Sequence, residues 1–363
     1  MIPSLGVLDS VDQRPVRRAA PSLILLGSAL CTLALAALPV TYLIRRAVEI
    51  DLETLSVVLF RAKMLEILLT TLTLTLSVAA FATILGVSIA WGLNNVALPA
   101  LGLIRALVIL PVAIPSYVFT YTWLSLEFLP TGFFAAVAVL TLTTAPYVTL
   151  AALAAFRRID ASQLDVAQTL GLNQWQTFMR VTFPQIRNAV GAGSLIVALY
   201  VLSDFGAVSL LGVDTFTRAI QNTYQGSFDR SSAAILALFL VAISTIVITL
   251  EIRTRTVSQT VTSSVRITKR LPYNNAFRAK VITIASISIY ILLALLLPLL
   301  VLIYRFVSRI TPLDYSSLLN AALSTISVSL IGALIAVLLA IPVALLASRG
   351  SRLAGKAINS ASR

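Results

Sequence analysis

The sequence predicts an all-α integral membrane protein, a polytopic bundle of about eight transmembrane helices. Of its 363 residues, 58% are hydrophobic and only 11% are charged, and the mean hydropathy is +0.96. Soluble domains carry about 25% charged residues, so this chain has too few to cover a soluble fold. A helix needs about 20 apolar residues to cross the hydrocarbon core. Eight runs meet this length: 22–44, 67–91, 103–126, 133–156, 189–211, 233–250, 281–303 and 321–347.

The first run follows three arginines, as the core of a cleaved signal peptide would. It is longer than a typical signal core, however, and it ends in Arg45 and Arg46. We therefore expect a retained membrane anchor, with a signal peptide as the alternative.

Several runs contain prolines that can kink a helix, and one run contains a pattern that resembles a β-strand. Pro111 and Pro115 in the third run, Pro146 in the fourth and Pro342 in the eighth each remove a backbone donor and predict a kink. The alternating Thr and Ser residues of 71–77 resemble a β-strand. Because an open strand cannot span lipid, we expect a helix there as well.

The distribution of charge predicts the orientation. With a cytoplasmic N-terminus, the inner segments hold 19 Lys and Arg and 5 acidic residues, whereas the outer loops hold 8 of each. Cytoplasmic loops of membrane proteins are enriched in Lys and Arg. The net charge of +13 is then an orientation signal for a multi-pass protein in a lipid bilayer, and it does not indicate a nucleic-acid partner.

The composition also limits the chemistry. There is no histidine, which excludes histidine-based catalysis and histidine metal ligands. The single cysteine, Cys31, excludes intramolecular disulfides and thiolate clusters. We therefore expect a protein that is not an enzyme and has no catalytic residue, metal site or cofactor. A membrane-embedded hydrolase would also need clustered carboxylates, which the sequence lacks.

Two segments recur in the same order along the chain. LPVTYLIRR at 38–46 matches LPLLVLIYR at 297–305, and the threonine-rich stretch 71–90 matches 325–344. The offsets are 259 and 254, as a shorter outer loop in the second copy would produce. Six spans separate the copies, so both insert in the same orientation as a parallel repeat.

The repeat predicts three parts. Residues 1–250 form a first repeat with six spans, 251–280 a basic cytoplasmic linker, and 281–363 the start of a second repeat with two spans. Because the second copy has fewer spans than the first, we expect an incomplete chain: a truncated product, a fragment or one half of a split protein.

The inner loop at about 157–187 has the pattern of two short helices around a glycine. Asp160 is a suitable N-cap for the first helix, and Gln163 would complete a capping box. Gly171 supplies the left-handed turn that ends a helix. The first helix would have one apolar edge, formed by Leu164, Ala167 and Leu170.

Asn173 and Gln176 repeat the capping box for the second helix, which we expect to end before Pro184. One of its faces would be formed by Trp175, Phe178, Met179 and Thr182. Such a pair of helices fits the groove of a partner protein. The alternative is an amphipathic loop resting against the bilayer.

This loop resembles the coupling loop of permease subunits of ATP-binding-cassette importers, whose pattern is E-A-A-x-x-x-G-x(9)-I-x-L-P. The spacing is kept throughout, while Asp replaces Glu and shortens the carboxylate by one methylene. Val, Val and Phe replace Ala, Ile and Leu. The resemblance implies that six positions couple the chain to its ATPase: Asp165, Ala167, Gly171, Val181, Phe183 and Pro184.

The segments 110–117, 203–209 and 212–217 look like the ferric-iron subgroup of this family, whose permeases have two fused homologous halves. The resemblance implies a type I importer permease of the bacterial inner (plasma) membrane that imports ferric iron by alternating access. Its partners would be a separate ATPase subunit that binds ATP, a periplasmic substrate-binding protein and a second permease half. Thiamine, polyamine and phosphonate permeases share the loop and remain alternatives.

The candidate substrate pathway consists of one acid and three tyrosines: Asp204, Tyr117, Tyr121 and Tyr200. An acid inside a span is costly and indicates function, and a carboxylate suits a hard cation such as ferric iron. The alternatives are that Asp204 braces a break at Gly206 and that the tyrosines only pack between helices.

Two further interpretations are weaker. Residues 350–356 fit the phosphate-loop pattern G-x-x-x-x-G-K but lack the following Ser or Thr and a preceding strand. We expect a basic segment after a helix there, without ATP. A secondary transporter or channel would need several charged residues at the membrane midplane, and the sequence has one.

Overall fold

The computed structural model describes residues 23–49, 62–127, 129–226, 229–254, 277–308 and 314–361. These residues form helices and connecting turns and contain no β-strand, so the predicted all-α class is confirmed. The chain divides into two units, residues 1–42 with 311–363 and residues 43–310. The segment ahead of the first span and most of the predicted linker lie outside the described residues.

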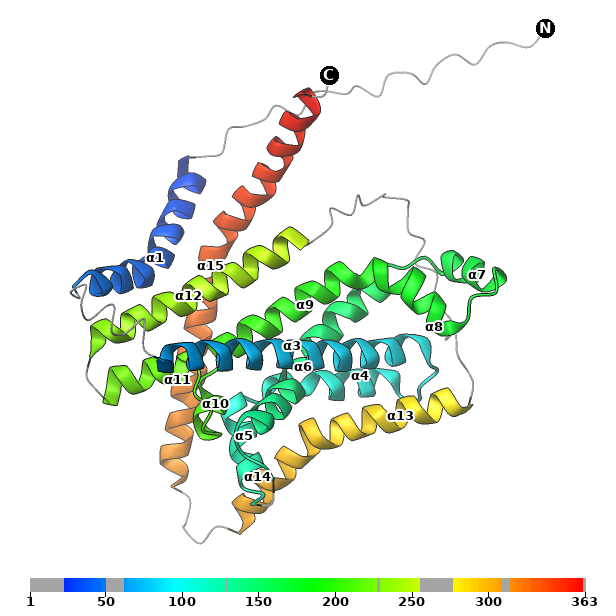
Figure 1. The fold of residues 1–363 in the computed structure, drawn as a ribbon, viewed down its shortest axis with the longest axis horizontal. Coiled ribbons are helices and arrows are strands. Elements are labelled where there is room, and N and C mark those ends of the chain that lie inside the picture. The colour runs from blue at the N-terminus through cyan, green and yellow to red at the C-terminus, as the bar shows by residue number, and fades with distance from the viewer. Residues whose placement is uncertain are drawn as a thin grey trace. The chain divides into compact units, whose positions relative to one another are not determined.

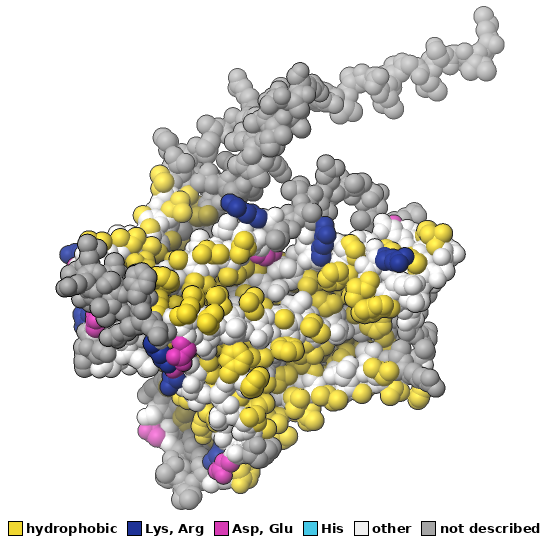
Figure 2. Space-filling view, in the orientation of Figure 1, with side chains coloured by type: hydrophobic (Ala, Val, Ile, Leu, Met, Phe, Trp, Pro, Cys, Tyr) yellow, Lys and Arg dark blue, Asp and Glu magenta, His cyan; other side chains and the backbone are white. Residues whose placement is uncertain are grey.

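Seven helices of the described chain are long and apolar enough to cross a membrane, and a bent helix pair makes an eighth candidate. The prediction of about eight spans is therefore confirmed. The candidates are Gly27–Val48, Lys63–Asn95, the pair Leu101–Ala113 with Ser116–Leu124, Phe133–Phe156, Gln174–Ser203, Arg230–Glu251, Lys280–Val307 and Tyr315–Leu345. On the face shown in Figure 2, hydrophobic side chains are spread across the described surface and charged side chains are few.

The first unit contains most of α1 (Leu23–Val48) and the long helix α15 (Tyr315–Ala361). The Thr32 hydroxyl donates to the carbonyl of Ser28 at 2.9 Å and to that of Leu339 at 3.2 Å, which joins the two helices. The phosphate-loop-like stretch 350–356 lies inside α15. It is helical, so it lacks the loop backbone that phosphate binding requires.

In the second unit, α3 (Ala62–Asn95), α6 (Phe133–Phe156) and α9 (Phe183–Ser203) pack side by side (Figure 1). Glycines allow this approach. A Cβ at Gly86 of α3 would lie 2.8 Å from the carbonyl oxygen of Ala145, and a Cβ at Gly193 of α9 would lie 2.9 Å from the Cα of Val148. Small residues have the same role in membrane helix packing generally, because they bring backbones close.

The alternating threonines of α3 are helical, as expected. The hydroxyls of Thr71 and Thr75 donate to the carbonyls four residues earlier, both at 2.7 Å. These bonds satisfy the hydroxyls inside the helix, so the polar side chains need no partner in lipid.

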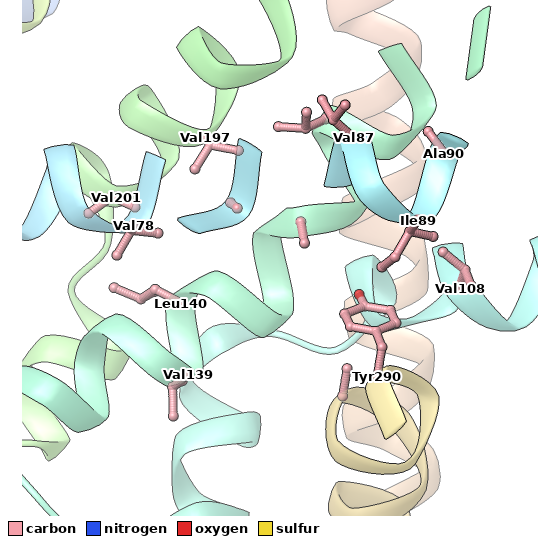
Figure 3. Close-up of a cluster of buried hydrophobic side chains, with 14 of the residues drawn as sticks. Val78, Val87, Ile89, Ala90, Val108, Val139, Leu140, Val197, Val201 and Tyr290 are labelled. Carbon is pink, nitrogen blue, oxygen red and sulfur yellow. The ribbon is translucent and has the colours of Figure 1, made fainter. Parts of the chain in front are cut away.

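Pro146 lies within α6 and leaves the carbonyl of Leu142 without its usual helical donor. The hydroxyl of Tyr290, from α13 (Phe277–Ile291), donates to that carbonyl at 3.0 Å. Figure 3 shows Tyr290 among the buried side chains of the second unit. The carbonyl that Pro146 leaves unpaired thus receives its hydrogen bond from a side chain of α13, a helix distant in sequence.

The structure confirms the predicted kink at Pro111 and Pro115 in the third span, and it ends the fifth span earlier than the hydropathy prediction. The third span is broken into α4 (Leu101–Ile109), a 3₁₀ turn (Leu110–Ala113) and α5 (Ser116–Leu124), with a bend of 90°. The fifth was expected to run to residue 211, but α9 ends at Ser203 and a short helix, α10 (Gly206–Leu210), follows. Hydropathy did not reveal this break because α10 is as apolar as the helix before it.

The remaining elements of the second unit complete the bundle. α13 and α14 follow the predicted linker and pack against α3, α4 and α5. The bounds not yet given are α7 (Ala161–Thr169), α8 (Gln174–Thr177), α11 (Phe216–Gln221), α12 (Arg230–Thr254), α14 (Leu297–Val307) and three π-helical turns, Phe178–Thr182, Asn222–Gly226 and Leu292–Leu296.

Candidate functional site

The inner loop begins with α7, whose N-cap is Asp160 as predicted. The Asp160 carboxylate accepts from the Ser162 amide at 3.0 Å. The expected capping box with Gln163 is wrong, because the side-chain oxygen Oε1 of Gln163 accepts instead from the side-chain amide of Gln185 in α9, at 2.9 Å. This bond ties α7 directly to the following span.

Gly171 ends the first helix with φ +80°, as predicted. The Gly171 amide donates to the Gln168 carbonyl at 2.8 Å, and the Leu172 amide donates to the Ala167 carbonyl at 3.1 Å. These two bonds form a Schellman motif, which satisfies the last carbonyls of the helix. The left-handed backbone explains why glycine occupies this position.

The apolar edge of α7 is shorter than expected. Leu164 and Ala167 are buried, but Leu170 is 76% exposed. A helix turns by about 100° per residue, so a residue six positions after Leu164 points about 120° away from it. Leu170 was therefore assigned to the wrong face.

The second helix, α8, has the predicted capping box in full. The Asn173 amide donates to the Gln176 side chain at 3.1 Å, and the Gln176 amide donates to the Asn173 side chain at 2.8 Å. The predicted end before Pro184 is wrong. The π-helical turn Phe178–Thr182 carries the chain without a break from α8 into α9.

The π turn explains how a proline fits into this helix. Proline cannot donate an amide hydrogen, and its ring collides with the carbonyl of the preceding turn. A π turn is wider, and Pro184 lies directly after it, within the first two positions of α9. Pro298 follows the π turn Leu292–Leu296 in the same way. The second helix of the loop and the span are therefore one continuous helical element.

The predicted face of the second helix is divided between two environments. Trp175 and Met179 are exposed, Phe178 is half-buried and Thr182 is buried. The first three line a groove of about 610 Å³, and Val87 of α3 lies on its other side. The extra residue of the π turn shifts the register, so the face does not continue straight to Thr182.

The six positions that match the coupling pattern lie on this helical hairpin. Asp165, Gly171, Phe183 and Pro184 are exposed, Val181 is half-buried and Ala167 is buried. The exposed members are available for contact with another protein, while Ala167 packs the hairpin together.

Asp204 lies at the break between α9 and α10 and is only 7% exposed. One carboxylate oxygen accepts from the Ser116 hydroxyl, and the other accepts from the Ala207 amide at 2.9 Å. The Asp204 carbonyl accepts from the hydroxyl of Thr217 in α11 at 2.7 Å. Asp204 therefore caps α10, which agrees with one of its two predicted roles.

The two broken spans meet at this position. Ser116 is the first residue of α5, directly after the bend of the third span. A Cβ at Gly206, the first residue of α10, would lie 2.9 Å from the Cβ of Tyr117. Only glycine permits this approach of α10 to α5.

The predicted pathway tyrosines lie around the same break. Tyr117 and Tyr121 are exposed and are one helical turn apart on α5. Tyr200 is half-buried, and its ring centroid lies 6.0 Å from that of Tyr147. The structure thus brings Asp204 to Ser116 and Tyr117 at the start of α5, with Tyr200 one helical turn before Asp204 on α9.

Sequence reasoning named a break at Gly206 beside Asp204, but it did not select Ser116 or Thr217 as members of this cluster. A signal for Ser116 was present, because a serine directly after a proline is typical of a helix start. Among the described residues, no group of three or more acidic, cysteine or histidine side chains is placed to hold a metal ion.

Residues 82–251 match the family described as "Binding-protein-dependent transport system inner membrane component". The chain is 33% identical over 326 residues to the Fe(3+)-transport system permease protein FbpB 2 of Haemophilus influenzae, covering 88% of this chain and 63% of that protein. It is 30% identical over 107 residues to chloroplastic sulfate permease 2 of Chlamydomonas reinhardtii, covering 28% of this chain and 29% of that one. Molybdate and molybdenum permeases also match over part of the chain.

Two solved structures of alginate-importing bacterial ABC transporters have a similar fold. One has a TM-score of 0.51 at 16% identity and covers 64% of this chain and 95% of that chain. The other, solved with an alginate-bound periplasmic protein, has a TM-score of 0.50 at 15% identity and covers 63% and 91%. The likeness confirms the predicted helical bundle of the ABC-importer permease kind.

Proposed function

We propose that the chain is the permease subunit of an ATP-driven importer, because residues 82–251 match the inner membrane components of binding-protein-dependent transport systems and the chain is 33% identical to a ferric-iron permease. The family consists of transport permeases, not enzymes. The proposed subunit moves its substrate by alternating access, while a separate ATPase subunit binds and hydrolyses ATP. The single observation that carries the proposal is the exposed hairpin of α7 and α8, which continues directly into the span α9.

Coupling to the ATPase is assigned to the six pattern positions on this hairpin: Asp165, Ala167, Gly171, Val181, Phe183 and Pro184. An exposed helical hairpin with apolar side chains fits a groove on a partner protein. Because α8 and α9 are continuous, a displacement of the docked hairpin would move the span itself.

Ferric iron is the proposed substrate. The Haemophilus influenzae ferric permease is the relative that covers 88% of this chain, whereas the sulfate relative covers 28%. Asp204 and the tyrosines Tyr117, Tyr121 and Tyr200 would offer oxygen groups to a hard cation along the pathway. A carboxylate at this position would repel an oxyanion such as sulfate. Thiamine, polyamine and phosphonate remain the alternative substrates.

The proposed partners and placement follow from the same premise. A periplasmic binding protein would dock on the outer loops; the similar alginate transporter was solved in complex with such a periplasmic protein. The excess of Lys and Arg in the inner segments supports a cytoplasmic N-terminus. We keep the division into a first repeat (1–250), a linker (251–280) and a second repeat (from 281). A second permease half, related by this repeat, would supply a second coupling loop.

The coupling role can be tested by co-purification of the chain with its ATPase subunit. Gly171→Ala places a side chain on a backbone at φ +80° and should weaken ATPase capture about fivefold, since a left-handed L-residue costs roughly 1 kcal/mol. Gly212→Ala is the matched control, because Gly212 has φ +75°, also has open space around it, and lies outside the loop. Equal capture by the two variants would show that this loop is not the docking element.

Substrate and energy source are tested in proteoliposomes that contain the permease, ATPase and binding protein. We expect ATP-dependent uptake of ferric iron and no uptake of sulfate or molybdate. Uptake driven by an ion gradient without ATP would instead support a secondary transporter.

A further inference from the structure

We propose that Ser116 is a positioning residue: its hydrogen bond to Asp204 passes the movement of the coupling loop to the bend in the third span. This inference rests on the proposed coupling role of α7 and α8. It adds a specific contact through which a cytoplasmic movement reaches the exposed tyrosines Tyr117 and Tyr121.

The first step is the continuity of the helix that leaves the loop. Gln174–Ser203 forms one span candidate of 30 residues, and at 1.5 Å per residue this element is about 45 Å long. Near the loop it is fixed by the bond between Gln185 and Gln163. Because no flexible segment interrupts it, the loop and the far end of α9 must move together.

The far end of this element is Asp204, which holds three other elements. Its carboxylate accepts from Ser116 of α5 and from the amide of Ala207 in α10, and its carbonyl accepts from Thr217 of α11. The α9 end is therefore linked to the start of α5 by a polar contact that excludes water, since Ser116 and Asp204 are both buried.

Burial makes this contact strong. A hydrogen bond to a carboxylate is stronger than one between neutral groups, and a low local dielectric strengthens it further. If α9 moved without α5, the carboxylate would lose a donor in an apolar surrounding, which is costly. The favoured response to a displacement of α9 is that the start of α5 follows.

The start of α5 is able to follow because the backbone before it is not helical. Ile114 is extended, with φ −88° and ψ 114°, and Pro115 has ψ 141°. These two residues produce the bend of 90° between the halves of the span. A rotation about this point would reorient Tyr117 and Tyr121 while α4 stays in place.

The test uses the assembled transporter in proteoliposomes and measures ATP hydrolysis and uptake of ferric iron in the same preparation. Ser116→Ala removes the donor with a minimal change in size. We expect hydrolysis to stay within about twofold of wild type and uptake to fall about tenfold, so that more ATP is hydrolysed per ion. Thr122→Val is the matched control, since the Thr122 hydroxyl is also buried on α5 but bonds only to Phe119 of the same helix, at 2.7 Å.

A double-mutant cycle tests whether the two residues act through one contact. Asp204→Asn alone and Asp204→Asn with Ser116→Ala should lower uptake to a similar level, because the second change removes a bond that the first has already weakened. Additive losses would show independent roles and would overturn the proposal. So would an unchanged ratio of uptake to hydrolysis in Ser116→Ala.

Labelling of α5 gives a readout that a merely structural role would not change. Tyr117→Cys, in a background with Cys31→Ser, is treated with a water-soluble thiol reagent before and after the ATPase is trapped with vanadate. We expect trapping to change the labelling rate, and we expect this change to disappear when Ser116→Ala is added. An undiminished change in the Ser116→Ala background would overturn the proposal. Equal ATPase capture by Gly171→Ala and Gly212→Ala would instead count against the coupling role itself.

Discussion

The hydroxyl of Tyr290 donates to the carbonyl of Leu142, the acceptor that Pro146 leaves unpaired one turn earlier in α6. The two residues are 148 positions apart, and Tyr290 belongs to the first span after the predicted linker. The carbonyl group that a proline leaves unpaired in the predicted first repeat therefore receives a hydrogen bond from a tyrosine in the predicted second repeat.

Tyr290→Phe should destabilise the bundle by about 1 kcal/mol, because it leaves a buried carbonyl without a donor while keeping the ring. The measurement is reversible unfolding in mixed micelles at increasing denaturing detergent. Tyr304→Phe serves as the control, since Tyr304 is exposed on α14 and should cost much less. Equal stability of Tyr290→Phe and wild type would mean that the bond is not important for folding.

Gly86→Ala should destabilise the packing of α3 on α6 by about 1–3 kcal/mol, because the added Cβ would lie 2.8 Å from both the Ala145 carbonyl oxygen and the Val148 Cβ. Backbone atoms cannot move aside as a flexible side chain can. Gly102→Ala is the matched control in α4, where an added Cβ meets no atom within 4 Å. We expect it to stay within about 1 kcal/mol of wild type. Similar unfolding curves for the two variants would contradict the close approach.

Local chemistry explains what could be predicted from the sequence. Hydropathy located the eight candidate spans of the described residues, because lipid demands long apolar helices regardless of tertiary contacts. The caps at Asp160, Gly171 and Asn173 were predictable because each depends on one or two residues and a fixed spacing.

The features that the sequence did not predict depend on contacts between residues far apart in the chain, or on which of two backbone conformations a segment adopts. Ser116 and Asp204 are 88 residues apart, and no local pattern joins them. Pro184 was expected to end a helix, yet a π turn accommodates it, and both outcomes are compatible with the same residues. The capping role of Gln163 failed because Gln185, on another helix, competes for its side chain.

Gln185→Leu should loosen α7 from α9, because it removes the bond to Gln163 and a second bond, at 2.9 Å, to the Val181 carbonyl. Both groups are exposed, so we expect global stability to change by less than about 0.5 kcal/mol. Hydrogen exchange of the α7 amides should become several times faster. Gln225→Leu, on the exposed turn Asn222–Gly226, is the control and should leave α7 exchange unchanged. Unchanged α7 exchange in Gln185→Leu would show that the bond does not hold the loop.

The junction of α3 and α11 should depend on pH through Asp214. The Lys63 ammonium lies 2.8 Å from the Asp214 carboxylate and lowers its pKa, and the Arg218 guanidinium, at 2.7 Å, lowers it further. A depressed pKa in the folded state means that this carboxylate stabilises the junction above the ordinary Asp pKa, about 3.9, and loses that effect as pH falls through the folded pKa.

Protection of the α11 amides from hydrogen exchange should therefore fall below about pH 4. Asp214→Asn should reduce protection at neutral pH and abolish this pH dependence. High salt should also lower the protection of the α11 amides in the wild type, since the side chains of Lys63, Asp214 and Arg218 are partly exposed. If the protection of Asp214→Asn still depended on pH, another carboxylate would be responsible for that dependence.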